Sequence, residues 1–180
     1  MIVTIDANIL IYLFDDKTSA PISKATGLPV DKCHERVKYL FQELEREKAK
    51  IVIPTPTLAE VLVRAQEGAP ERLRILKASK HFRIVAFDER AAVEFAATQS
   101  NRIALGERSP AQTRAKAKFD DQIVAIAAVE QSDTIYSDDE DVRKLAASKF
   151  KVIGIDELAL PPENEQRDIF EDLDTGIEPS

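Results

Sequence analysis

Short β-branched apolar runs alternate with longer amphipathic stretches along most of the chain. Five runs are typical of buried strands, because each is short, rich in Val and Ile and bounded by polar or turn-forming residues. They are MIVTID at 1–6, KIVIPT at 50–55, FRIVAFD at 82–88, DTIYS at 133–137 and FKVIGID at 150–156.

Between these runs, apolar residues recur at the three- and four-residue spacing of helices. In residues 33–48, for example, Val37, Leu40, Phe41 and Leu44 share one helical face. The other predicted helices are ANILIYLF at 7–14, PTLAEVLVRAQ at 56–66, APERLRILKAS at 69–79, ERAAVEFAATQSNRIAL at 89–105, DDQIVAIAAVEQS at 120–132 and DEDVRKLAAS at 139–148. This alternation predicts an α/β fold: a three-layer α/β/α sandwich around a mainly parallel sheet of about five strands.

Three segments show neither the short apolar runs of strands nor the three- and four-residue spacing of helices. Residues 15–31 mix Pro, Gly, Ser and charges, which predicts a loop long enough to be an insertion or a flap. Residues 106–118 are predicted to form a polar, basic loop. After Pro161 and Pro162 the chain is acidic and poor in apolar residues. We therefore expect one domain over residues 1–160 and an acidic tail over 161–180 that is flexible or only loosely docked.

Charge and cysteine content narrow the function classes only a little. The net charge of the 180 residues is −7, but the last twenty residues hold seven Asp or Glu and one Arg, which is −6, so residues 1–160 carry only −1. The acidity therefore does not exclude nucleic acid as a ligand. A single cysteine, Cys33, excludes an intrachain disulfide and a cysteine-built metal site, which favours a cytoplasmic setting. No apolar run has the length that a membrane span needs.

Carboxylates stand where predicted strands end or helices begin. Asp6 ends the first strand, Asp138, Asp139 and Asp141 follow the fourth, and the pair Asp120–Asp121 opens the helix before it. In a parallel sheet these points meet at one edge, where several carboxylates would raise each other's pKa until a cation intervenes. Oxygen ligands of this kind suit Mg²⁺, which can activate water for phosphodiester cleavage.

A simpler interpretation exists for each acid. Acids in a first helical turn are common caps, so Asp6, Asp120 and Asp138 fit that role as well. Glu60 lies on or next to the apolar face of its helix, and its alternative is an ion pair with Arg64 at i+4. The two histidines, His34 and His81, are expected to be structural or surface residues.

Four stretches, in order, resemble the motifs of PIN-domain proteins. IDANILIYLF at 5–14 resembles the opening motif, in which an Asp ending the first strand precedes a small residue, an Asn and an apolar helix. TPTLAEVL at 55–62 resembles the second motif, with Glu60 as its acid. FDDQIVAIAAV at 119–129 resembles the third, with Asp120 in the motif position because Ile123 follows it by three. IYSDDEDV at 135–142 resembles the last, through Ser137 and Asp139.

The resemblance implies an Mg²⁺- or Mn²⁺-dependent endoribonuclease. Its catalytic and metal-binding acids would be Asp6, Glu60, Asp120 and Asp139. Supporting or alternative polar groups would be Asn8, Ser137, Asp121, Asp138 and Asp141. Many small prokaryotic members are toxins of VapBC-type pairs, so the resemblance also implies an antitoxin partner and a homodimer. The basic stretch ERSPAQTRAKAK is expected either to hold RNA phosphates or to be a solvated loop, and its cations are Arg108, Arg114, Lys116 and Lys118.

Two other functions remain open at this point. A Mg²⁺-dependent phosphoryl-transfer domain also gathers Asp at strand ends, but it needs a Lys after a late strand, which FKVIGID lacks at its carboxyl end. A non-catalytic PIN-fold module for protein interaction would use the same carboxylates only as helix caps.

Overall fold

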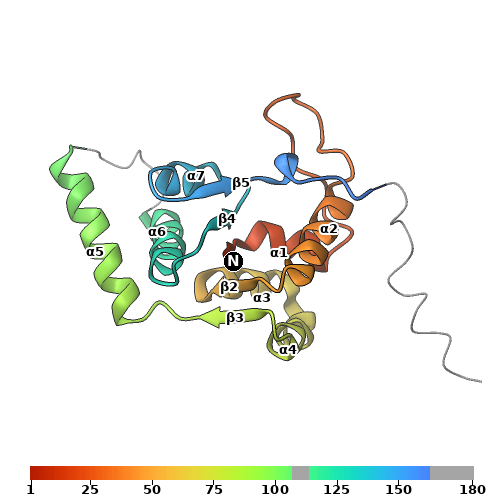
Figure 1. The fold of residues 1–180 in the computed structure, drawn as a ribbon, viewed down its shortest axis with the longest axis horizontal. Helices are drawn as coiled ribbons and strands as arrows, with labels where there is room; N and C mark the ends of the chain where they lie inside the picture. The colour runs from red at the N-terminus through yellow and green to blue at the C-terminus, as the bar shows by residue number, and fades with distance from the viewer. Residues whose placement is uncertain (107–113, 163–180) are drawn as a thin grey trace, which may run out of the picture.

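A five-stranded, fully parallel sheet forms the centre of the molecule. The computed structural model describes residues 1–106 and 114–162, with the backbone alone for 114–118. The strands are β1 (Ile2–Ile5), β2 (Lys50–Pro54), β3 (Phe82–Val85), β4 (Thr134–Tyr136) and β5 (Lys151–Ile153). Their order across the sheet is β3-β2-β1-β4-β5, and every neighbouring pair is parallel (Figure 1).

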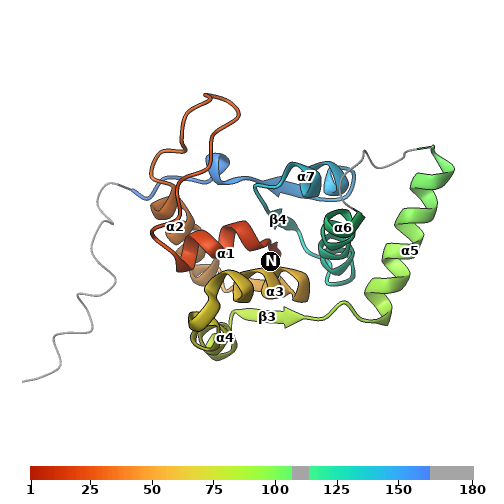
Figure 2. The same cartoon turned by 180° about the vertical axis from the view of Figure 1, so that it is seen from behind.

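Helices connect the strands and cover both faces of the sheet. Their bounds are α1 (Ala7–Phe14), α2 (Cys33–Arg46), α3 (Thr55–Ala65), α4 (Ala69–Ala78), α5 (Glu89–Ala104), α6 (Arg114–Val129) and α7 (Glu140–Ala146), with short 3₁₀ turns η1 (Gln66–Gly68) and η2 (Ile155–Glu157). In Figures 1 and 2, α1 and α2 lie on one side of β1 and β4, and α5 and α6 lie on the other.

The two-residue period of the strands explains the two apolar layers. Val3 and Ile5 of β1 are fully buried in a core shared with α1, α2, α3 and α4. Ile135 of β4 points the other way, into a cluster with α6 and α7, and Val52 of β2 meets Ala91 at the start of α5. Successive side chains of a strand face opposite sides, so a run that is apolar throughout is covered on both. The predicted three-layer α/β/α sandwich is confirmed.

The start of α6 differs from the prediction. The helix begins at Arg114, six residues before the predicted start at Asp120, so residues 114–118 are helical and not part of a loop. Ala, Arg and Lys are strong helix formers, and no breaker separates Arg114 from Asp120. Asp120 is therefore the seventh residue of α6, and the alternative that it caps the helix is wrong.

The loop at 15–31 is irregular, as predicted, and is held to the domain at its start. An isolated antiparallel bridge pairs Ile22 with Pro29. The ring nitrogens of His34 lie 3.1 Å and 2.9 Å from the carbonyl oxygens of Tyr12 and Thr18, which gives this histidine a structural role. The predicted tail lies outside the described residues from position 163 onward. In the described ranges no helix has the length and apolarity to cross a membrane.

The chain reverses its direction across the sheet between β1 and β4. From the central β1 it proceeds to β2 and β3 on one side and then returns to β4 and β5 on the other. The connections after β1 and after β4 leave to opposite faces of the sheet. In open parallel sheets, such a switch point leaves a crevice at the carboxyl ends of the strands, where ligands bind.

Two Ile→Ala substitutions on helices test where the core lies. Ile126 of α6 is fully buried between β2 and α5, and Ile103 of α5 is 78% exposed. Ile126→Ala is expected to lower the free energy of unfolding by about 2–5 kcal/mol, because it leaves a cavity. Ile103→Ala is expected to change it by less than about 0.5 kcal/mol. Urea denaturation of both variants measures the difference, and equal effects would contradict this packing.

Candidate metal centre

Asp6 joins β1 to α1 and is buried at the switch point. It is the N-cap of α1, and its Oδ1 accepts the backbone N–H of Ala7 at 2.7 Å. Its Oδ2 accepts from the hydroxyl of Ser137 at 2.6 Å and from Nδ2 of Asn8 at 3.1 Å. The capping role and a place in an acidic site are therefore compatible for this residue.

Ser137 and Asn8 connect the turn after β1 to the turn after β4. The buried hydroxyl of Ser137 donates to Asp6 and accepts the backbone N–H of Asp139 at 3.1 Å. Oδ1 of Asn8 accepts the backbone N–H of Asp138 at 3.2 Å. These two polar side chains therefore connect the two turns.

Three carboxylates come together beside this link. One oxygen from each of Asp120, Asp139 and Asp141 lies within 4.8 Å of the others. Asp120 projects from α6 and is buried, whereas Asp139 and Asp141 are half-buried at the start of α7. Asp139 is the N-cap of α7, where its Oδ1 accepts the N–H of Asp141 at 2.8 Å. The predicted alternative cap, Asp138, does not hold this position.

Burial and neighbouring charge disfavour the ionised form of Asp6. The pKa of Asp6 is raised to about 6, because loss of water and, to a smaller extent, the carboxylates of Glu60 and Asp139 raise it more than the hydrogen bonds from Ser137 and Ala7 lower it. Three carboxylates with a fourth charge close to them form a strongly negative site, and a bound cation is the usual means of stabilising such a site.

Glu60 lies closer to solvent than its sequence predicts. Its side chain is exposed, and the residues of α3 that face the core are Thr57 and Val61. Glu60 therefore lies next to the apolar face of α3 and not on it. Arg64 donates to Thr18 Oγ1 at 3.3 Å instead of to Glu60. The charge of Glu60 still reaches Asp6, which places it at the rim of the site.

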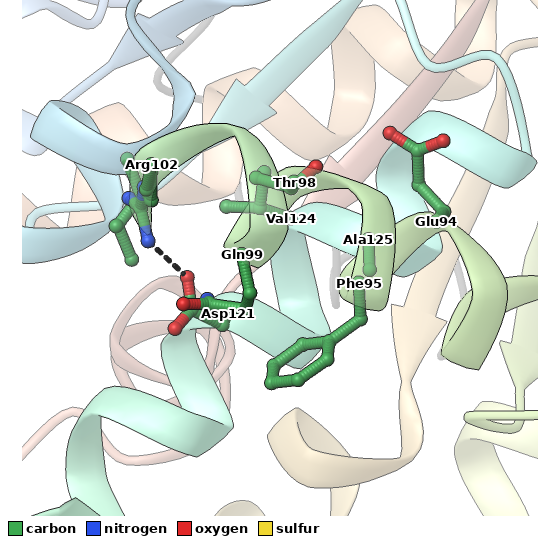
Figure 3. A pocket seen from close by; sticks show the side chains of 9 residues that line it. Glu94, Phe95, Thr98, Gln99, Arg102, Asp121, Val124 and Ala125 are labelled. Carbon is green, nitrogen blue, oxygen red and sulfur yellow. Dashed lines mark hydrogen bonds and ion pairs between the residues drawn. The ribbon is translucent and has the colours of Figure 1, made fainter. Parts of the chain in front are cut away.

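Asp121 faces away from the three carboxylates. It forms an ion pair with Arg102 of α5 at 2.8 Å, and Figure 3 shows the two side chains meeting next to Gln99. Burial raises the pKa of Asp121 more than Arg102 lowers it. The adjoining cavity between α5 and α6 measures about 10 Å³, barely enough for one water molecule. Asp121 therefore holds α5 against α6 and lies outside the acidic cluster.

Asp138 also points away from its neighbour Asp139. Its Oδ1 accepts the backbone N–H of Ile155 at 3.1 Å. A Cβ at Gly154 would lie 3.0 Å from both Asp138 Oδ1 and Arg143 Nη2, so a larger residue there would press against the ends of both side chains. Burial is the main cause of the raised pKa of the Cys33 thiol on α2, and the charge of Asp138 is the second cause. Sequence reasoning missed Gly154, whose position directly after the last strand was the available signal.

The predicted cations before the third motif cannot be placed as side chains. Arg108 lies outside the described residues, and Arg114, Lys116 and Lys118 belong to the first turns of α6, where the backbone alone is described. Their helical backbone places all three on the helix that carries Asp120.

The donor set fits a hard divalent cation. Among the described residues, the group whose ligand atoms lie close together consists of Asp120, Asp139 and Asp141, with no imidazole or thiolate in it. Carboxylate oxygens suit Mg²⁺ and Mn²⁺, whereas zinc sites normally include His or Cys. A cluster of this composition has the ligand chemistry to hold a metal ion.

Comparison with known proteins supports the fold. No protein-family model and no curated protein sequence matches this chain. Among solved structures, the VapBC2 complex of Rickettsia felis, bound to a DNA fragment from its promoter, contains a chain 14% identical to this one, with a TM-score of 0.58 over 86% of this chain and 98% of that one. FitAcB of Neisseria gonorrhoeae matches at 19% identity and a TM-score of 0.55, over 85% and 97% of the two chains.

A third similar structure is VapC20 of Mycobacterium tuberculosis, which is described as a sarcin–ricin-loop cleaving toxin. It is 13% identical, with a TM-score of 0.53 over 82% of this chain and 95% of that one. The protein therefore has the fold of the PIN-domain VapC toxins, as the four sequence motifs predicted.

The raised pKa of Asp6 predicts how the stability of the metal-free protein changes with pH. The folded carboxyl, with a pKa of about 6, holds its proton more tightly than the unfolded one at 3.8. Below pH 4 the protonated Asp6 therefore makes its full contribution to the free energy of unfolding, which is roughly 3 kcal/mol. This contribution is lost as the pH rises through about 6. Asp6→Asn is expected to remove the decline. Urea denaturation in EDTA between pH 4 and 7 measures the decline. Parallel stability profiles for the native protein and Asp6→Asn would contradict the prediction.

Substitutions of the adjacent acids Asp120 and Asp121 of α6 provide a matched pair of variants for a test of metal binding. Asp120→Asn is expected to weaken Mn²⁺ binding on the order of 10- to 100-fold, since it removes a carboxylate from the cluster. Asp121→Asn is expected to leave the affinity unchanged and to lower the melting temperature, because it disrupts the pair with Arg102. Isothermal titration calorimetry and thermal denaturation distinguish the two. Equal losses of affinity would show that the cluster does not bind the ion through Asp120.

Proposed function

We propose that the protein is a divalent-metal-dependent endoribonuclease of the VapC toxin type. The observation that carries the proposal is the convergence of Asp120, Asp139 and Asp141 beside the buried Asp6, at the switch point of a VapC-like fold. Asp6, Asp120 and Asp139 are the proposed catalytic carboxylates. Asp141 is the proposed further ligand, and Glu60 is the acid at the rim.

Each residue of the site has a role that follows from its contacts. Asp120, Asp139 and Asp141 would hold the cation, Mg²⁺ or Mn²⁺. When bound, such a cation activates water and stabilises the leaving oxygen of a phosphodiester. Ser137 orients Asp6 through its hydroxyl and orients the Asp139 turn by accepting its N–H. With a pKa of about 6, Asp6 is mostly ionised at pH 7 and mostly protonated at pH 5.

The substrate and partner proposals depend on the similar structures and on the basic stretch. Arg108, Arg114, Lys116 and Lys118 are proposed to hold RNA phosphates, because they precede or begin the helix that carries Asp120. An antitoxin partner is proposed because the similar structures include VapBC and FitAcB. A homodimer is proposed only because the resemblance of the sequence motifs implies one. The phosphoryl-transfer alternative is less favoured, because Gly154 and Ile155, and no lysine, follow β5.

Cleavage of RNA by two neighbouring Asp→Asn variants tests this function. Asp139→Asn is expected to reduce the rate on the order of 100-fold, since it removes a carboxylate from the site. Asp138→Asn is expected to retain activity, because an amide oxygen still accepts the N–H of Ile155. EDTA is expected to stop cleavage, and added Mn²⁺ to restore it. If neither EDTA nor Asp139→Asn changes the rate of cleavage, the cleavage comes from a contaminating nuclease and not from the acidic site. That result would favour the non-catalytic interaction module.

A further inference from the structure

An exposed aromatic ring stands next to the acidic cluster. Phe119 directly precedes Asp120 on α6 and is 54% exposed. Within residues 1–106 and 114–162, every other Phe or Tyr is buried or half-buried. Single exposed apolar residues are common on proteins, so the position of Phe119 matters more than its exposure.

Helix geometry gives the direction of this ring. Neighbouring positions on a helix are about 100° apart. Asp121 faces Arg102 of α5, and Asp120, one step round the helix, faces the cluster. Phe119 is a second step in the same direction, about 200° from Asp121, so it points away from α5.

The face of α6 that carries Phe119 is the one that packs on β2. Ile126 comes seven residues later, which is nearly two turns, and it contacts Val52 in the middle of β2. Phe119 therefore lies beyond the carboxyl end of β2, where α3 begins. The helices α3 and α6 contact each other there (Figure 2). This places Phe119 on the side of the cluster that faces α3, the helix that carries Glu60.

We propose that Phe119 is a stacking platform for one base of the RNA whose phosphate lies at the acidic site. The proposal rests on the proposed function, because it needs a nucleic acid at that site. Aromatic side chains bind single-stranded RNA by stacking on the faces of its bases, and the contacted nucleotide is unpaired. Stacking accepts every base, so Phe119 positions the strand and does not select its sequence.

A neutral ring suits this position better than a cation. The carboxylates of the cluster would pair with a lysine or arginine placed this close, and the pairing would compete with the divalent ion for their oxygens. An aromatic face adds affinity for RNA and leaves these oxygens available. Phe119 is therefore a substrate-positioning residue, next to the metal ligands but not one of them.

A purely structural role for Phe119 makes a different prediction. Phe119 is four residues before the buried Ile123, and an aromatic–aliphatic pair at this spacing stabilises a helix. Leucine can form the same apolar pair, but it has no aromatic face for a base. Phe119→Leu therefore separates stacking from helix packing, and Phe119→Tyr restores the aromatic face.

Binding of a fluorescently labelled, single-stranded RNA tests the proposal on the full-length protein. Fluorescence anisotropy is measured in Ca²⁺, which takes the same oxygen ligands, and a gel checks that the RNA stays intact. Phe119→Leu is expected to weaken binding about tenfold, and Phe119→Tyr to stay within about twofold of the native protein. Ile103→Ala, at an exposed position of α5, is the control and is expected to change nothing. All three variants are expected to keep the native melting temperature.

A scan with abasic RNA identifies the contacted base. RNA that lacks one base at a time is expected to bind the native protein about tenfold more weakly at one position next to the cleaved bond. The Phe119→Leu protein is expected to show no further loss at that position, because the two changes remove the same contact.

Three outcomes would overturn the proposal. They are unchanged binding by Phe119→Leu, an equal loss by Phe119→Leu and Phe119→Tyr, and effects of Phe119→Leu and of the missing base that add at every position. A change of oligomeric state in Phe119→Leu, measured by analytical ultracentrifugation, would also overturn it and would assign the ring to a contact with a second copy. A failure of the nuclease assignment is seen separately, as no cleavage by the native protein in Mn²⁺, and it leaves the binding results readable.

Discussion

The hydroxyl of Ser137 is the interaction on which the arrangement of the acidic site depends. It donates to Asp6 Oδ2 at 2.6 Å and accepts from the N–H of Asp139 at 3.1 Å, and the two aspartates belong to turns 133 positions apart in the chain. A buried hydroxyl that both donates and accepts has almost no freedom to rotate, so it fixes one turn relative to the other. The parallel pairing of β1 with β4 places the turns side by side, and this side chain then sets their spacing.

Helix capping and the acidic cluster use the same residues. Asp6 and Asp139 each accept a backbone N–H of the helix that they begin, and both also face the other carboxylates. The positive end of a helix favours a negative charge there, which offsets part of the cost of placing carboxylates close together. Capping therefore does not compete with a metal-binding role in this fold. It is one reason why the acids stay in position before any cation is bound.

The two adjacent acid pairs show how far sequence reasoning reaches. Motif spacing favoured Asp120 over Asp121 and Asp139 over Asp138, and the structure brings the favoured acids together in one cluster. The partners of the other two acids were not visible in the sequence, because Arg102 belongs to a different helix and the N–H of Ile155 follows another strand. The early start of α6 and the exposure of Glu60 were missed for a related reason. Local patterns do not reveal which neighbour covers a helical face.

The sequence by itself determined the alternation of strands and helices, and with it the parallel sheet and the edge at which the acids gather. These features follow from apolar periodicity and from the geometry of parallel strands, which are properties of single segments. Only the tertiary structure decided which acids face one another. Neighbouring residues on a helix point about 100° apart, so Asp120 of α6 faces the cluster while Asp121 faces Arg102 of α5. The contact of the α1–α2 loop with η2, in which Ser23 donates to Asp156, is likewise made between distant segments.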